Sequence, residues 1–168
     1  MKTLYLVRHS KSSWEDQEFD DFDRPLKSSG VKDAYLMGSY LRNKGIMPGL
    51  ILSSPAARAL NTAVVFSGQM GFPYSGILLS IKLYESSAGD ILDVISGLNT
   101  SEDSIMVFGH DPSLSNLFMK LTGISIEKIP TSAVAAIALN INDWEDIKAS
   151  KGELVFMEKP KEVKANVK

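Results

Sequence analysis

Apolar and polar positions follow two patterns along the 168 residues of the chain. Short apolar runs are typical of buried strands, and apolar residues that recur every three or four positions are typical of helices. The apolar runs predict strands at residues 3–8, 50–54, 77–84, 104–109, 133–141 and 153–158, with the last at an edge of the sheet. The helical spacing predicts helices at residues 28–45, 54–68, 88–98 and 111–123.

Strands and helices that alternate in this way form βαβ units. We therefore predict an α/β fold, a three-layer sandwich in which a mostly parallel central sheet carries helices on both faces. Residues 1–158 are predicted to form a single domain, because 44% of the chain is hydrophobic and can supply one sizeable core. The lysine-rich residues 159–168 lack aromatic side chains and are predicted to form a polar, disordered tail.

Two of the predicted helices begin at sequence signals directly after a strand. Ser54 and Asp111 are each followed by a proline and are predicted to be N-caps. Because both helices follow buried strands, their N-termini are expected at one edge of the sheet.

Charge and composition narrow the classes of partner. The formal net charge is −2 and the isoelectric point is about 5.7, so binding to nucleic acid or to an anionic membrane is not expected. The chain has no cysteine, which excludes disulfides and thiolate metal sites. Its N-terminal apolar run is too short for a signal sequence and no later run is long enough to span a bilayer, so we expect a cytoplasmic protein.

The segment between the first strand and the first helix is polar, acidic and turn-prone. A loop of this length in a compact domain is usually functional or disordered. Its acidic part, residues 15–23, either rims a substrate pocket or is a solvated loop, and the sequence leaves both open. Lys11, Ser12 and Ser13 are candidates for phosphate or substrate contacts.

Charged side chains stand at or just after the ends of several predicted strands. They are Arg8, His9, Arg58, Glu85 and His110. Each of these residues alone could have a purely structural role. Because ligands bind beyond the carboxyl ends of parallel strands, however, we expect these side chains to converge. Two arginines, two histidines and two helix N-termini around one crevice predict a site for an anion, and guanidinium forks match a phosphoryl group.

Four segments of the chain resemble, in order, the signature segments of the histidine phosphatase superfamily, which is also called phosphoglycerate mutase-like. They are LVRHSKSSW, RPLKSSG, SSPAARALNTA and VFGHDPSLSNL. The short chain and the sequences RPL and GHDP are most similar to the phosphohistidine phosphatase SixA branch. The resemblance implies a phosphoglycerate mutase-like fold.

The resemblance also implies roles for single residues. His9 matches the nucleophile, Arg8 and Arg58 match the phosphate clamp, and His110 matches the second histidine of the pocket. Ser10 stands where the family usually has glycine. Its hydroxyl is expected to bind phosphate, with mild crowding by the added side chain as the alternative.

The general acid stays open at this level. Glu85 occupies the position where many relatives carry a proton donor, and we prefer it. Asp111 is the alternative, because a branch of acid phosphatases uses an aspartate directly after its second histidine. The SixA branch is thought to need no strong acid, so the third possibility is that neither residue serves.

The chemistry agrees with these roles. A neutral His9 imidazole attacks phosphorus, water hydrolyses the phosphohistidine, and nearby guanidinium groups lower the histidine pKa. No metal or other cofactor is required. Short links between the motifs predict an open pocket that suits a phosphorylated protein side chain, most simply phosphohistidine. The alternatives are a small-molecule phosphomonoesterase acting on a phosphorylated metabolite, a mutase, and a phosphate-binding module without turnover.

Overall fold

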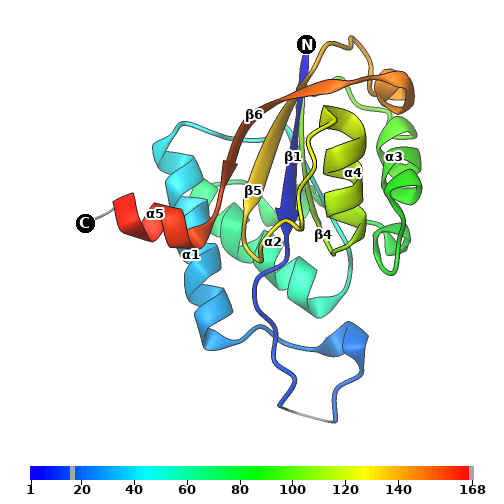
Figure 1. Ribbon diagram of the computed structural model, residues 1–168. Helices are drawn as coiled ribbons and strands as arrows, with labels where there is room; N and C mark the ends of the chain where they lie inside the picture. Colours follow the sequence, from blue (N-terminus) through cyan, green and yellow to red (C-terminus); the bar gives the residue numbers. More distant parts are fainter. Residues whose placement is uncertain (16–17, 167–168) are drawn as a thin grey trace.

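The structure, a computed structural model, describes residues 1–15 and 18–166 (Figure 1). Within these residues the strands are β1 (Lys2–Arg8), β2 (Leu50–Ser53), β3 (Ile77–Leu79), β4 (Ser104–Gly109), β5 (Val134–Leu139) and β6 (Gly152–Glu158). They form one sheet in the order β3-β2-β4-β1-β5-β6. The first four run parallel, whereas β5 is antiparallel to β1 and β6 is antiparallel to β5. The predicted mostly parallel sheet, with residues 153–158 at an edge, is confirmed.

Helices cover both faces of this sheet, as Figure 1 shows. One face carries α1 (Ser28–Asn43), α2 (Ala57–Met70) and α5 (Pro160–Asn166). The other carries α3 (Ala88–Ser96), α4 (Ser113–Thr122) and the 3-10 helix η4 (Trp144–Ala149). Three short 3-10 turns lie between elements, namely η1 (Asp21–Asp23), η2 (Tyr74–Gly76) and η3 (Ile81–Leu83). The predicted three-layer α/β sandwich is confirmed.

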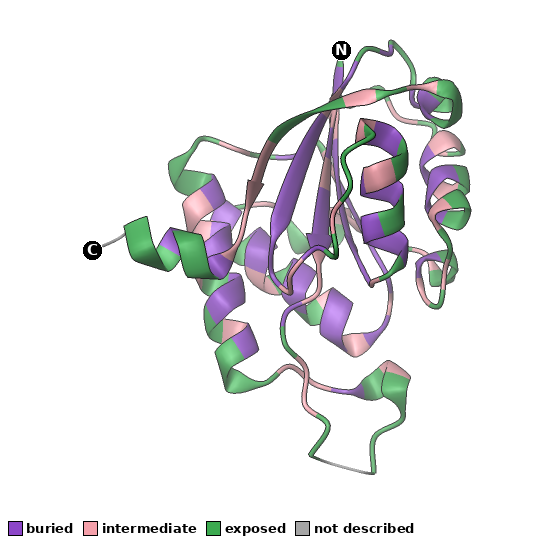
Figure 2. Cartoon of the chain, in the orientation of Figure 1, coloured by how far each residue is buried: buried purple, intermediate pink, exposed green. Residues whose placement is uncertain are grey.

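The central strands are apolar on both faces because each face meets a helix layer. In β1, Leu4 and Leu6 pack in the core beneath α3 and α4, whereas Val7 packs in the core beneath α1 and α2. In β4, Ile105 and Met106 divide between the same two cores. Figure 2 shows the inner helix faces and the central strands as largely buried, whereas β6 is exposed or intermediate. Polar side chains therefore emerge only where these strands end.

The predicted strand at residues 77–84 is wrong beyond Leu79. β3 pairs only with β2, and its last residue lies opposite Ser53, where β2 ends. The Ser80 N–H still donates to the Ser53 carbonyl at 3.1 Å, and the chain then turns into η3. This turn carries Tyr84 toward the ends of the neighbouring strands.

The prediction that Ser54 and Asp111 are N-caps is wrong, because the N-cap positions are Ala56 and Pro112. α2 begins three residues after Ser54, whose hydroxyl accepts a hydrogen bond from the Ala56 N–H at 3.2 Å. α4 begins two residues after Asp111, whose carboxylate accepts from the Ser115 N–H at 3.2 Å. The turn before each helix thus holds a polar side chain at the sheet edge.

The prediction of a disordered tail at residues 159–168 is wrong over α5. Pro160 and Val163 are buried, and Val163 packs in the same core as α1 and α2. Lys164 forms an ion pair with Asp33 of α1 at 2.8 Å. Residues 167–168 lie outside the described part of the chain. Among the described helices, none is long and apolar enough to cross a membrane.

Candidate active site

The two histidines of the chain follow neighbouring strands. The last residues of β1 and β4, Arg8 and Gly109, lie opposite each other in the sheet. His9 and His110 come next, and their ring centroids are 5.3 Å apart. The structure thus brings together two side chains that are 101 positions apart in the sequence.

The His9 ring is oriented by a hydrogen bond to its own turn. Its Nδ1 lies 2.7 Å from the Ser10 carbonyl oxygen. A carbonyl oxygen can only accept, so Nδ1 carries the proton and Nε2 keeps its lone pair. The free nitrogen is therefore Nε2.

Ser10 supports this turn from the interior. Its hydroxyl lies 2.5 Å from that of Ser132, and both residues are fully buried. Its N–H donates to Thr62 at 2.9 Å, and the Thr62 hydroxyl donates to the Arg58 carbonyl at 2.6 Å. The predicted phosphate contact of the Ser10 hydroxyl is wrong, because this hydroxyl faces Ser132 instead.

Arg8 is held at the end of β1 by two oxygen groups. Its Nη1 donates to the Ile129 carbonyl at 3.0 Å and lies 3.9 Å from the Asp111 carboxylate. The Ser115 hydroxyl donates to the Asp111 carboxylate, and its oxygen lies 2.8 and 2.7 Å from the two carboxylate oxygens. The Asp111 carboxylate therefore orients Arg8 and the start of α4.

Arg58 is held from the acidic loop. Its Nη1 donates to the Asp21 carbonyl at 2.6 Å, and its Nη2 lies 3.1 Å from the Asp21 carboxylate. The same carboxylate accepts from the Tyr84 hydroxyl at 2.6 Å and pairs with Arg24 at 3.1 Å. The Tyr84 hydrogen bond, followed by those from Arg58 and Arg24, lowers the Asp21 pKa to about 2 against a smaller opposing effect of burial. The acidic loop does rim the site, through Asp21.

Sequence reasoning missed Asp21, Arg24 and Tyr84 as members of the site. Arg24 stacks over the Trp14 ring at 3.3 Å and donates to the Ser12 hydroxyl at 2.7 Å. The sequence held only weak signals for two of them. Arg24 lies within the segment RPLKSSG, and Tyr84 directly precedes Glu85.

His110 is oriented by Ser54, at the end of β2. Its Nε2 lies 2.8 Å from the Ser54 hydroxyl, which already accepts from the Ala56 N–H. The Ser54 hydroxyl can donate to Nε2, and in that arrangement a neutral His110 carries its proton on Nδ1. The Tyr84 ring packs edge-on against His110 with centroids 5.6 Å apart.

Both histidines are held neutral. Burial lowers the His9 pKa to about 4, with Arg58, Arg8 and Arg24 lowering it further against the Ser10 hydrogen bond, which raises it. Burial and then Arg58 lower the His110 pKa to about 3. The predicted direction is confirmed for His9, but burial is a larger cause than the arginines.

Three nitrogen atoms around the histidines lack a hydrogen-bond partner. They are Arg8 Nε, Arg58 Nε and His110 Nδ1, and in the described chain only one other buried side-chain atom is unpartnered. Buried polar groups are almost always paired, so a cluster of unpaired donors indicates a place for acceptor atoms. Two of the three belong to guanidinium groups, which favours an anion.

Glu85 lies at the rim. It is exposed and adopts a left-handed backbone conformation with φ of 51°. Within the described residues it forms no hydrogen bond or ion pair, although its charge helps to raise the pKa of Tyr84.

The loop residues before the acidic segment are engaged locally. Ser12 accepts from Arg24, and Ser13 accepts from the Glu15 N–H at 3.1 Å. Lys11 is exposed. Over residues 1–15 and 18–166, no group of three or more His, Cys, Asp or Glu side chains is placed to hold a metal ion.

Comparison with known proteins identifies the family. The family model described as "Histidine phosphatase superfamily (branch 1)" matches residues 4–93. The chain belongs to the histidine phosphatase superfamily. An uncharacterized chloroplastic protein of Arabidopsis thaliana is 33% identical over 159 residues, which cover 90% of this chain and 72% of that protein. An uncharacterized protein of Mycobacterium tuberculosis is 28% identical over 165 residues, which cover 92% of this chain and all of that protein.

Solved structures share the fold. The protein histidine phosphatase SixA, solved with tungstate, superposes with a TM-score of 0.82 at 23% identity and covers 99% of both chains. The match to the histidine phosphatase superfamily spans Arg8, His9 and Arg58, whereas His110 lies beyond it. The place of His110 in the site therefore rests on its geometry beside His9.

Proposed function

We propose that the chain is a metal-independent phosphatase that forms a phosphohistidine on His9 and removes the phosphoryl group from phosphohistidine side chains of proteins. The observation that carries this proposal is the His9 ring, whose Nδ1–H is held by the Ser10 carbonyl so that Nε2 keeps its lone pair, in a site that also holds unpartnered nitrogen atoms of Arg8, Arg58 and His110. A nucleophilic nitrogen together with groups that can bind phosphate oxygens supports attack on phosphorus.

In the first step, His9 Nε2 forms a bond to phosphorus while the bond from phosphorus to the substrate imidazole breaks, and this imidazole, protonated on its other ring nitrogen, takes the electron pair and leaves as the neutral ring. Arg8, Arg58 and the His110 Nδ1–H bind the three equatorial oxygens, where negative charge is concentrated. In the second step, water attacks phosphorus and the bond to Nε2 breaks, which releases inorganic phosphate and neutral His9.

Neutral histidines suit both steps. With a pKa of about 4, His9 has its nucleophilic lone pair at neutral pH. Neutral His110 donates through Nδ1–H without adding a charge beside His9. A bound phosphoryl group carries negative charge and raises the pKa of both rings, which favours protonation of His110 to the imidazolium, a stronger donor than the neutral ring.

The position of Glu85 supports phosphohistidine as the substrate. Imidazole is a good leaving group and needs little help from a buried acid, whereas an alkoxide needs a proton in the transition state. Glu85 is an exposed rim residue, and Asp111 is engaged with Arg8 and Ser115. Glu85 is therefore not a buried acid, and the Asp111 carboxylate already has partners. The shared fold with a protein histidine phosphatase points the same way.

A small-molecule phosphomonoesterase is the second candidate, favoured by Glu85 alone, because a rim carboxyl can reach the leaving oxygen of a bound metabolite. The deciding experiment compares kcat/KM for a phosphohistidine peptide, a phosphoserine peptide and a sugar phosphate. We expect the phosphohistidine peptide to exceed the other two by at least about a hundredfold, the lower end of the usual general-acid range. A preference for the sugar phosphate would favour the second candidate.

A phosphate-binding module without turnover is tested separately. Such a protein binds phosphate but leaves nitrophenyl phosphate intact. We expect steady multiple turnover of nitrophenyl phosphate in the presence of EDTA, with competitive inhibition by vanadate. Binding of vanadate without any turnover would contradict the proposal.

A further inference from the structure

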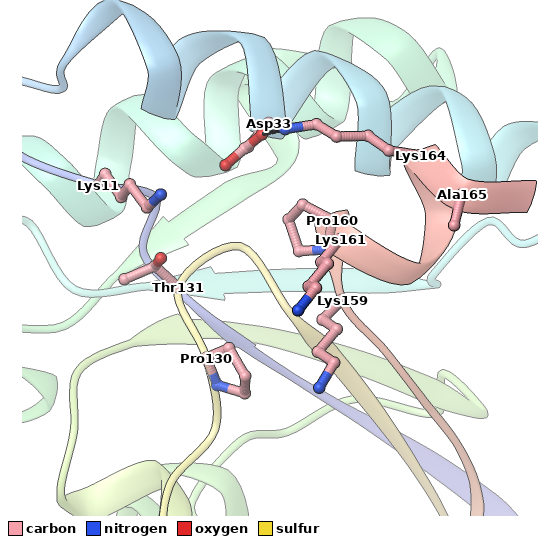
Figure 3. A pocket seen from close by; sticks show the side chains of 9 residues that line it. All are labelled: Lys11, Asp33, Pro130, Thr131, Lys159, Pro160, Lys161, Lys164 and Ala165. Carbon is pink, nitrogen blue, oxygen red and sulfur yellow. Dashed lines mark hydrogen bonds and ion pairs between the residues drawn. The ribbon is translucent and has the colours of Figure 1, made fainter. Parts of the chain in front are cut away.

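An open groove of about 600 Å³ lies between the loop after β1, the segment before β5 and α5. The described residues that line it are Lys11, Asp33, Pro130, Thr131, Lys159, Pro160, Lys161, Lys164 and Ala165 (Figure 3). Four of them are lysines and only one is acidic, although the chain as a whole has a net charge of −2. Positive charge is therefore concentrated at this groove.

The far wall of the groove is a fixed part of the fold. α5 is anchored by Val163, which is buried against the core of α1 and α2. Figure 3 shows Lys164 reaching from α5 to Asp33 of α1, and this ion pair measures 2.8 Å. The single acidic residue of the groove is thus already neutralised by one of the four lysines.

The other three lysines are available to a ligand. Within the described chain, Lys11 and Lys161 form no ion pair, and Lys159 has only a 3.5 Å contact with Glu162, an exposed pair of little strength. The groove therefore presents two lysines without an ion pair in the described chain, Lys11 and Lys161, and a third, Lys159, whose only ion pair there is long and exposed.

The groove adjoins the catalytic site through its other wall. Lys11 is two residues beyond His9, a span of at most about 7 Å along an extended chain. Thr131 precedes Ser132, whose N–H donates to the Arg8 carbonyl at 3.0 Å. A ligand that places its phosphoryl group on His9 can therefore continue into the groove.

We propose that this groove binds acidic residues that flank the phosphorylated residue of a protein substrate, an inference that rests on the phosphatase function proposed above. An extended polypeptide advances about 3.3 Å per residue, so side chains two to four positions from the phosphorylated residue reach the lysines. Pro130, Pro160 and Ala165 offer apolar contact to the rest of the segment.

A polypeptide fits the lining better than a nucleic acid does. Single-stranded nucleic acids bind by stacking their bases on aromatic side chains. None of the nine described lining residues is aromatic. The lysines alone would attract a nucleic acid by charge, but the groove offers its bases no stacking partner.

The test compares two phosphohistidine peptides that differ only in three flanking residues on each side, glutamate in one and glutamine in the other. Wild-type protein is expected to show a kcat/KM at least about fivefold higher for the glutamate peptide at low salt, and 0.5 M salt should remove most of this preference, because the Debye length is then only a few ångström. The variant Lys159→Gln/Lys161→Gln should reduce the preference to less than about twofold. Equal kcat/KM for both peptides in the wild type would overturn the proposal.

A matched control is available at the opposite end of the sheet. Lys148 and Lys151 lie in η4 and just before β6, and the variant Lys148→Gln/Lys151→Gln removes the same number of charges. This variant should keep the wild-type preference. If both double variants lose it equally, the effect belongs to the net charge of the protein and the groove is not the docking site.

Binding of the unphosphorylated peptides separates the groove from the chemistry. If nitrophenyl phosphate is hydrolysed but neither phosphohistidine peptide is, the proposed substrate fails, and fluorescence anisotropy of the labelled glutamate and glutamine peptides still tests the groove. Tighter binding of the glutamate peptide, lost only in Lys159→Gln/Lys161→Gln, supports docking. Equal binding of the two peptides would rule out an acidic polypeptide as the occupant. The same conclusion would follow if a single-stranded oligonucleotide bound more tightly than the glutamate peptide and Lys159→Gln/Lys161→Gln lost this binding.

Discussion

Arg58 is the residue outside the histidines on which catalysis should depend most. Its guanidinium is oriented by Asp21, and its Nε is buried without a partner. We predict that Arg58→Ala lowers kcat/KM for nitrophenyl phosphate by about a hundredfold or more, since one charge-stabilising donor is worth about 3 kcal/mol. Arg42→Ala, at an exposed position near the end of α1, is the matched control. A loss below about fivefold would place Arg58 outside the pocket.

Glu85 tests whether a leaving-group acid exists. If Glu85 supplies a proton, Glu85→Gln should slow an alkyl phosphate by about 10² to 10⁴ and spare a phosphohistidine peptide, because only the alkoxide needs the proton. Because Glu85 is exposed, Glu85→Gln should change kcat/KM for the phosphohistidine peptide by less than about twofold. Glu153→Gln, on exposed β6, controls for a lost surface charge. Equal losses on both substrates would instead make Glu85 a positioning residue.

Individual site residues could be predicted from the sequence only where they directly follow or end a predicted element. Arg8, His9 and His110 stand at the ends of buried strands, so their convergence follows from the order of the parallel sheet. Asp21 reaches Arg58 because the loop folds back over α2, and nothing in a run of carboxylates tells which one will do so. The Ser10 hydroxyl was predicted to bind phosphate because Ser10 follows His9 at the family's usual glycine position, and its observed partner, Ser132, is too distant in the sequence to be foreseen.

At the scale of elements, the largest difference between sequence and structure is α5. Its segment is short and rich in lysine, which is typical of a disordered tail. The decisive residues are Pro160 and Val163, which become buried only because α1 provides an apolar surface beside them. Local composition carries no information about that surface, so the helix could not be predicted from the segment alone.

The role of α5 in stability can be measured at Val163. We predict that Val163→Ala lowers the free energy of unfolding by about 1 to 2 kcal/mol, because the side chain is buried and its methyl groups pack in a core. Urea denaturation with Val155→Ala as the control, at an exposed position of β6, gives the comparison. The two variants would have equal stability if α5 were not docked.

At the scale of the whole molecule, the alternation of apolar runs and helical spacing was sufficient for the fold class. β1 and β4 are apolar on both faces because both face helix layers, and this requirement is visible in the sequence. The early end of β3 was not predictable, since it depends on where the neighbouring strand stops. The sequence therefore specifies the layers more clearly than the ends of the elements.

The two histidines of the site should make the whole molecule sensitive to acid. Their pKa values are about 4 and about 3 in the folded chain, against 6.5 for an unperturbed histidine. Between pH 6.5 and these values the unfolded chain binds more protons than the folded chain. The histidines therefore cost no stability above pH 6.5, and the free energy of unfolding decreases as the pH falls below that value. At about 1.4 kcal/mol for each unit of pKa difference, the loss amounts to several kcal/mol by pH 4.

This dependence can be measured by urea denaturation at pH 7, 5.5 and 4.5. The double variant His9→Asn/His110→Asn has neither titrating ring and should show a flatter dependence of unfolding free energy on pH. Asp21, with a pKa of about 2, adds a further loss below about pH 4 in both proteins. Parallel curves for wild type and variant would mean that the histidines titrate normally in the folded chain.

The central claim is that His9 carries the phosphoryl group during turnover. The most direct measurement is mass spectrometry of protein quenched in alkali within milliseconds of mixing with substrate, followed by acid treatment of a parallel sample. We predict a single phosphate on the peptide that contains His9, stable in alkali and lost in acid, and we predict that His9→Ala shows neither this phosphate nor turnover. A phosphate on another residue, or full activity in His9→Ala, would contradict the account.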